Sequence, residues 1–155
     1  MLFSVYSFSQ NIETVPINEV NTVPIFPGCE KGNNNSKRKC LSKKIQEHTK
    51  RYFRAAEVTK NLGLSGKQRI STIFKIDTTG RIIEVRARAA HKNLEKEAIR
   101  VIKLLPILKP GIYEGKKVIV PYSLPIIFEI NWFLNNYKSN LIPLTGNLAN
   151  QNWTG

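Results

Sequence analysis

Apolar and polar positions alternate on both sides of a turn between residues 70 and 89, which predicts a β-hairpin. The inward positions are Ile70, Thr72, Phe74 and Ile76 before the turn and Ile83, Val85, Ala87 and Ala89 after it. The turn is Asp77-Thr78-Thr79-Gly80, in which Gly80 can adopt a positive φ. The outward positions of the second strand are Glu84, Arg86 and Arg88. We therefore expect one face of the sheet to meet water or a partner.

Helical spacing is found on both sides of this hairpin. Before it, Leu41, Ile45, Tyr52 and Ala56 predict a helix over about 42–62. We expect Ser42 to cap that helix and Gly63 to end it. After the hairpin, Leu94, Ala98, Val101, Ile102 and Leu105 share one helical face. Here Asn93 is the predicted cap and Pro106 the stop.

The strongest alternation in the chain runs from 118 to 130 and predicts a third strand. Its inward positions are Val118, Val120, Tyr122, Leu124, Ile126, Phe128 and Ile130, and its outward positions are Ile119, Pro121, Ser123, Pro125 and Ile127. Proline has no N–H to donate to a neighbouring strand, so this strand should lie at a sheet edge. Because Pro121 and Pro125 have the same parity, both can face the outer side of that edge.

The order of these elements predicts an α+β fold. If the last strand lies beside the first strand of the hairpin, it is antiparallel to it. The expected architecture is then a three-stranded antiparallel-type sheet of order 2-1-3 with two helices packed on one face.

Composition divides the rest of the chain into further segments. Residues 1–10 resemble the last part of a secretory signal and are predicted to be the remnant of an export signal. Residues 11–36, rich in Pro and Asn, predict an extended arm. Residues 37–130 form the predicted folded domain, and residues 131–155 an Asn-rich tail that we expect to be flexible.

The charge of the chain favours anionic partners without choosing among them. The sequence holds 24 Lys and Arg against 11 Asp and Glu, a formal net charge of +13. A basic cluster between Lys37 and Arg54 keeps open a nucleic-acid-binding α/β domain as an alternative function. The sequence lacks the aromatic pairs by which RNA-binding sheets stack bases, so we do not expect nucleic acid to be the partner.

The cysteines and histidines do not predict a metal site. Cys29 and Cys40 predict one disulfide in an exported protein and free thiols in a cytosolic one. Their spacing, with His48 and His91 elsewhere, matches no common zinc ligand pattern. No nucleophile–base pair and no phosphate loop is found, so we expect no enzyme and no cofactor. No apolar run is long enough to span a membrane.

Taken in order, several short motifs resemble the carboxy-terminal domain of the TonB energy transducers. They are Val23-Pro24-Ile25-Phe26-Pro27-Gly28-Cys29, Phe74-Lys75-Ile76-Asp77-Thr78-Thr79-Gly80-Arg81-Ile82, Leu94-Glu95-Lys96-Glu97-Ala98, Leu108-Lys109-Pro110-Gly111 and Pro125-Ile126-Ile127-Phe128-Glu129-Ile130. Cys29 and Cys40 fit a subgroup with a Pro-Gly-Cys segment and a second cysteine. The resemblance covers about 24–130.

This resemblance implies a periplasmic protein-binding module of outer-membrane transport. In the family, the short TonB box of an outer-membrane receptor adds to the edge of the last strand, which is β-augmentation. The implied partner-binding residues are Val118, Ile119, Val120, Pro121, Tyr122, Ser123, Leu124, Pro125, Ile126, Ile127 and Phe128. Pro121 and Pro125 leave fewer amides for a peptide to use.

Two further expectations concern the role of the chain. A working transducer also has a membrane helix and a Pro-rich spacer, and this sequence shows neither, so we expect it to bind without transmitting force. A homodimer through the strand edge, and a structural adaptor of the cell envelope, are the remaining alternatives.

Overall fold

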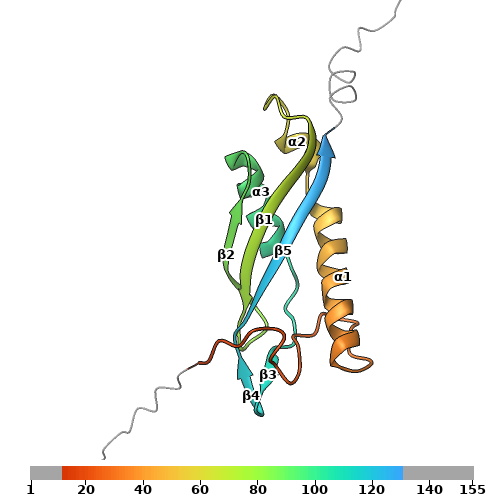
Figure 1. Ribbon diagram of the computed structural model, residues 1–155, viewed down its shortest axis with the longest axis vertical. Helices are drawn as coiled ribbons and strands as arrows, with labels where there is room; N and C mark the ends of the chain where they lie inside the picture. Colours follow the sequence, from red (N-terminus) through yellow and green to blue (C-terminus); the bar gives the residue numbers. More distant parts are fainter. Residues whose placement is uncertain (1–11, 131–155) are drawn as a thin grey trace, which may run out of the picture.

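The computed structural model describes residues 12–130 of the chain. Their main sheet has three antiparallel strands in the order β2-β1-β5 (Figure 1). The strands are β1 (Gly66–Ile76), β2 (Ile82–Arg88) and β5 (Val120–Ile130). The predicted hairpin and the predicted strand order are both confirmed. The predicted export-signal remnant (1–10) and tail (131–155) lie outside the described residues.

Two helices cover one face of this sheet. They are α1 (Asn34–Tyr52) and α3 (Lys92–Lys103). Their apolar residues share one core with the inward residues of the strands: Leu41, Ile45, Leu94, Ala98 and Ile102 pack with Ile70, Phe74, Ile76, Leu124 and Ile126. The fold class predicted from the sequence, α+β with helices on one face, is therefore confirmed.

The first helix differs from the prediction at both ends. It begins at Asn34, because the Asn33 side chain accepts a 2.9 Å hydrogen bond from the N–H of Ser36 and caps it. Ser42, the predicted cap, lies inside the helix. The helix also stops at Tyr52, and only one separate turn, α2 (Ala55–Val58), follows before Gly63. The predicted span 42–62 was wrong in these bounds.

The break between α1 and α2 has a tertiary cause. The ring of Phe53 packs against Phe128, with ring centroids 5.2 Å apart. The next backbone N–H, that of Arg54, donates to the Glu97 carboxylate at 3.0 Å instead of continuing the helix.

The predicted cap of α3 was wrong. His91, not Asn93, is the residue directly before the helix, and its ring nitrogen accepts a hydrogen bond from the N–H of Asn93 at 3.1 Å.

The hairpin contains a β-bulge that the alternation did not reveal. The pairing of β1 with β2 shifts between Ile73 and Lys75, and Glu84 has a φ of 50°. An extra residue in one strand shifts the side-chain alternation on one side of the bulge relative to the other. As a result Ile82 packs against the core, whereas Ile83, the predicted inward residue, pairs with the outward-facing Lys75.

A second, smaller sheet follows α3 and was not predicted. Strands β3 (Gly111–Tyr113) and β4 (Lys116–Val118) form a hairpin, whose turn residues Glu114 and Gly115 both have positive φ. The predicted last strand is therefore divided at Ile119 into β4 and β5. Val118 and Val120 pack in a second apolar cluster with Val15, Val20 and Val23.

The residues before α1, which we call the arm (residues 12–33), pack along the end of the domain that holds this second apolar cluster. Backbone bridges join Thr14 to Ile119, Thr22 to Ile112 and Ile25 to Lys109. The arm thus ends at Asn33 rather than at residue 36, and it contributes buried valines to the fold.

Candidate partner-binding edge of the sheet

Strand β5 forms one edge of the three-stranded sheet, with β1 as its only neighbour along 120–130 among the described residues. The carbonyl oxygen of Leu124 faces β1, because the hydroxyl of Thr72 donates to it at 2.6 Å. In an antiparallel strand, backbone groups of alternate residues point to opposite sides. The even residues of β5 therefore face β1, and the odd residues face outward.

The two prolines fall on the outward side, as expected. Pro121 pairs with Lys75 and Pro125 with Ser71, so neither interrupts the register with β1. On the outward side, N–H donors are left at Ser123, Ile127 and Glu129, while the carbonyl oxygens of all the odd residues remain acceptors.

The structure divides the predicted binding residues into three groups. Val118, Val120, Leu124 and Ile126 are buried, and Ile119, Pro121, Tyr122 and Phe128 are half-buried. Ser123, Pro125 and Ile127 are exposed. Val118 does not belong to the edge, since it lies in β4 and pairs with Gly111.

The start of the edge is occupied by the arm. The N–H of Val15 donates to the carbonyl oxygen of Ile119, and the N–H of Ile119 donates to that of Glu13, both at 2.9 Å. These bonds form a parallel bridge. Among residues 12–130, the part of the edge left unpaired therefore begins at Pro121.

A cleft of about 380 Å³ lies beside this open edge. We call it the edge cleft; its lining is Pro16, Ile17 and Asn18 of the arm, Arg38 and Ser42 of α1, and Pro121, Tyr122 and Ser123 of β5. The hydroxyl groups of Ser42 and Tyr122 are 2.8 Å apart and hydrogen-bonded to each other. Ser42, predicted as a helix cap, instead positions an edge residue.

In the part of the chain that the structure describes, the sheet face opposite the helices is uncovered. Ile73 and Ile127 on this face are 52% and 51% exposed. Arg69, Arg86 and Arg88 share the face, because Arg69 pairs with Ile127 and Arg86 with Ile73. Lys75 and Glu84 form an ion pair of 2.6 Å there. A hollow of about 380 Å³ beside this pair also touches Pro121, Tyr122 and Ser123.

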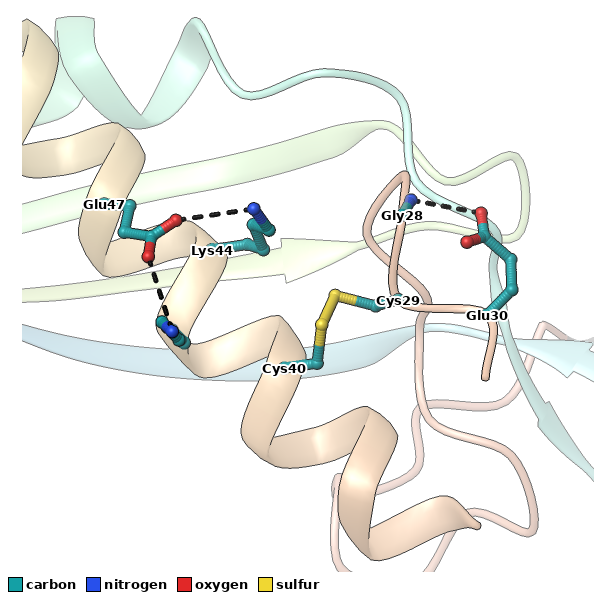
Figure 2. Close-up of a disulfide and its surroundings, with 7 residues drawn as sticks. Gly28, Cys29, Glu30, Cys40, Lys44 and Glu47 are labelled. Atoms are coloured by element: carbon teal, nitrogen blue, oxygen red, sulfur yellow. Dashed lines mark hydrogen bonds and ion pairs between the residues drawn. A yellow bond between two sulfur atoms is a disulfide. The ribbon is translucent and has the colours of Figure 1, made fainter. Parts of the chain in front are cut away.

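A disulfide ties the arm to α1. Cys29 and Cys40 are bonded, with their Cα atoms 5.7 Å apart (Figure 2). Near it, the N–H of Gly28 donates to the Glu30 carboxylate at 3.2 Å. The backbone N–H of Glu30 itself, followed by that of Gly28, lowers the Glu30 pKa. The disulfide closes a loop whose constraint contributes roughly 3 kcal/mol in the chain-entropy model.

Both histidines contact helices. His48 lies 3.1 Å from the carbonyl oxygen of Val101 and so joins α1 to α3. Burial lowers the His48 pKa, which favours the neutral ring with its Nε2–H as donor. Within residues 12–130 no group of three or more His, Cys, Asp or Glu side chains is placed to hold a metal ion.

An ion pair between the buried Glu97 and the partly exposed Arg100 stabilises the far end of α1. Glu97 accepts from Nε and Nη2 of Arg100 at 2.8 and 2.6 Å, and Arg100 also donates to the Tyr52 carbonyl oxygen at 2.8 Å. The hydrogen bonds from Arg100 hold the Glu97 pKa below its ordinary value. This pair is structural, because it joins α3 to the end of α1.

Sequence reasoning missed the residues of the edge cleft outside β5. Arg38 was one of many basic residues between Lys37 and Arg54, and such runs usually form a solvated helix face. Ile17 and Asn18 belong to the arm. No local signal distinguishes these residues, because only the packing of the arm on α1 and β5 brings them together.

Among the helices of residues 12–130, none has the length and apolarity that a membrane crossing requires.

Comparison with known families agrees with the resemblance over the later part of its predicted extent of 24–130; the Val23–Cys29 motif and the cysteine subgroup lie outside the match. The family model described as the Gram-negative bacterial TonB protein C-terminal matches residues 56–130. The match covers all three strands of the main sheet and α3, whereas the arm, the disulfide and α1 precede it. A search of curated proteins and a search of solved structures found no match. Such domains serve energy-dependent transport across the cell envelope by protein interaction and are not enzymes. Residues 56–130 therefore belong to the family of TonB C-terminal domains.

Proposed function

We propose that this domain binds the TonB box of an outer-membrane receptor as an added strand on the edge of β5, between Pro121 and Glu129. The observation that carries the proposal is the open outward side of this edge. Within residues 12–130, no strand pairs with it beyond Ile119. An unpaired strand edge offers backbone donors and acceptors that an extended peptide can use.

Other features of the domain are consistent with this function. Transducers of this family work in the periplasm, and the disulfide between Cys29 and Cys40 fits an oxidising compartment of that kind. The proposed location is therefore periplasmic. Pro121 and Pro125 provide acceptors but no donors, so binding depends on peptide N–H groups that face the β5 carbonyls.

A titration of the full chain with synthetic TonB-box peptides, followed by NMR, tests this proposal. We expect the largest amide shifts at Ser123 and Ile127, whose N–H groups face outward. Ser123→Pro removes one outward donor, and we expect it to weaken binding about three- to tenfold. Ser123→Ala keeps the N–H and is the matched control. The proposal fails if no amide between Pro121 and Glu129 shifts.

One observation also supports the nucleic-acid alternative. Arg69, Arg86 and Arg88 are exposed on the open sheet face and form no ion pair with any residue of 12–130. Electrostatic binding to nucleic acid weakens steeply with added salt. Retention of DNA or RNA on the protein at low ionic strength, lost on changing these arginines to glutamine, would favour this function. No retention at low ionic strength would eliminate it.

A second copy of the chain is an alternative occupant of the same edge. Two β5 strands that paired would form a continuous sheet. Sedimentation measurements over a range of protein concentrations test this: a mass that rises with concentration in wild type, and not in Ser123→Pro, would indicate a homodimer through the edge.

A further inference from the structure

The edge cleft carries a specific chemistry besides its shape. Its lining includes one cation, Arg38, and no acidic residue. Of the three hydroxyl groups in the lining, those of Ser42 and Tyr122 are hydrogen-bonded to each other, and the third belongs to Ser123. The guanidinium is therefore the charged group that a molecule entering this cleft would meet.

Arg38 uses few of its hydrogen-bond donors. Its Nη2 donates to the carbonyl oxygen of Ile17 at 2.7 Å, and its Nε is buried and has no hydrogen-bond partner among residues 12–130. It forms no ion pair with the other residues of 12–130. A guanidinium has five N–H donors, and a buried donor without an acceptor is costly. Arg38 is thus held at the edge with capacity for an anionic acceptor.

The position of the cleft relates it to a docked strand. Side chains of a strand point alternately to the two faces of its sheet. A peptide added to β5 beside Ser123 would present alternate side chains to the helix side, where Arg38 and the arm lie, and to the open face, where Ile73 lies. One helix-side residue of such a peptide falls next to the edge cleft.

We propose that Arg38 is a specificity-determining residue that selects a carboxylate side chain on the helix-facing side of the bound peptide. This inference rests on the docking function proposed above. The carboxylate accepts hydrogen bonds from the unused guanidinium donors, in a geometry that a planar fork suits better than an ammonium group does. Because only one peptide position reaches the cleft, this contact also fixes the register of the added strand.

A cycle of protein and peptide variants tests the role of Arg38. The probe is the TonB-box peptide that binds most tightly in the NMR titration, with Glu and then Gln placed at each position in turn. In wild type we expect one position at which Glu binds about tenfold tighter than Gln. In Arg38→Gln this preference should fall below about twofold, and in Arg38→Lys it should be intermediate.

A control variant separates charge recognition from movement of the arm. Asn34 holds the arm by accepting from the N–H of Val23 at 2.8 Å and donating to the carbonyl oxygen of Val20 at 3.2 Å. Asn34→Ala loosens these contacts without changing Arg38, and we expect it to keep the preference for Glu.

Three outcomes would overturn the inference. If Glu and Gln peptides bind wild type equally at every position, Arg38 selects no carboxylate, although docking on β5 stands. If the preference persists in Arg38→Gln, another group reads the charge. If no peptide binds the wild-type protein, the docking function and the role of Arg38 fail together.

Discussion

The backbone N–H of Val15 donates a 2.9 Å hydrogen bond to the carbonyl oxygen of Ile119, the residue directly before β5. The arm therefore adds to the sheet at this residue in the way proposed for a receptor peptide farther along β5. Val15 is 3% exposed and packs with the valines of the second apolar cluster. The arm is held by burial of its side chains as well as by its backbone.

We expect Val15→Ala to loosen the arm locally. Losing two buried methyl groups costs about 1.5 kcal/mol, which raises the population of the open arm roughly tenfold. Hydrogen exchange at the Ile119 amide, which donates to Glu13, should accelerate by about that factor. Leu104→Ala is the control, because Leu104 is 49% exposed and lies outside this cluster. Unchanged exchange at Ile119 would show that the cluster does not hold the arm.

Gly80 is expected to be the least replaceable turn glycine of the domain. It has a φ of 82°, and a Cβ there would overlap the carbonyl oxygen of Leu108. The Leu108 backbone cannot move freely, because its N–H donates to the Gly80 carbonyl oxygen at 2.9 Å. Gly80→Ala should lower the free energy of unfolding by roughly 3 kcal/mol or more, from left-handed strain and overpacking together.

Gly115 offers a matched comparison for that experiment. Its φ is 75°, and a Cβ there would have nothing within 4 Å. Gly115→Ala should therefore lower the free energy of unfolding only by the strain of about 1–2 kcal/mol. Urea unfolding of both variants measures the difference. Equal losses would mean that the contact of Gly80 with Leu108 adds nothing to the cost.

The pair of Glu97 and Arg100 is expected to make the domain less stable in acid. The Glu97 pKa is lowered in the folded state, first by the hydrogen bonds from Arg100. The stabilisation is therefore complete above the ordinary glutamate pKa of about 4.3 and is lost as the pH falls through the lower folded pKa. Glu97→Gln should lower the free energy of unfolding at neutral pH by roughly 1–3 kcal/mol.

The measurement for this prediction is urea unfolding at a series of pH values between neutrality and strong acid. Glu97→Gln should show a shallower loss of stability below about pH 4.3 than wild type does. Some loss of stability should remain in acid, because the Asp77 pKa is also lowered in the folded state. Burial alone would raise the Asp77 pKa, but hydrogen bonds from Thr79 and Arg81 outweigh burial. If the free energy of unfolding of Glu97→Gln fell with pH as steeply as that of wild type, the pair of Glu97 and Arg100 would not be a source of the acid sensitivity.

Local patterns were sufficient to predict the main sheet. The hairpin, the even core face of the last strand and its place at an edge follow from side-chain alternation and from the missing N–H of proline, which are properties of neighbouring residues. The bulge at Glu84 was not predictable in this way, because Glu84 is an ordinary residue in an alternating pattern. Its positive φ is seen only in the paired strands.

The sequence by itself determined the three strands of the main sheet, the presence of the two long helices, the α+β class, the resemblance to the TonB family and the outward parity of Pro121 and Pro125. Only the tertiary structure decided where the open edge begins and what lies beside it. The backbone of Ile119 is hydrogen-bonded to the arm. The hydroxyl groups of Ser42 and Tyr122 are hydrogen-bonded to each other although these residues are 80 positions apart in the chain. Contacts of this kind depend on the packing of distant segments, which no local periodicity encodes.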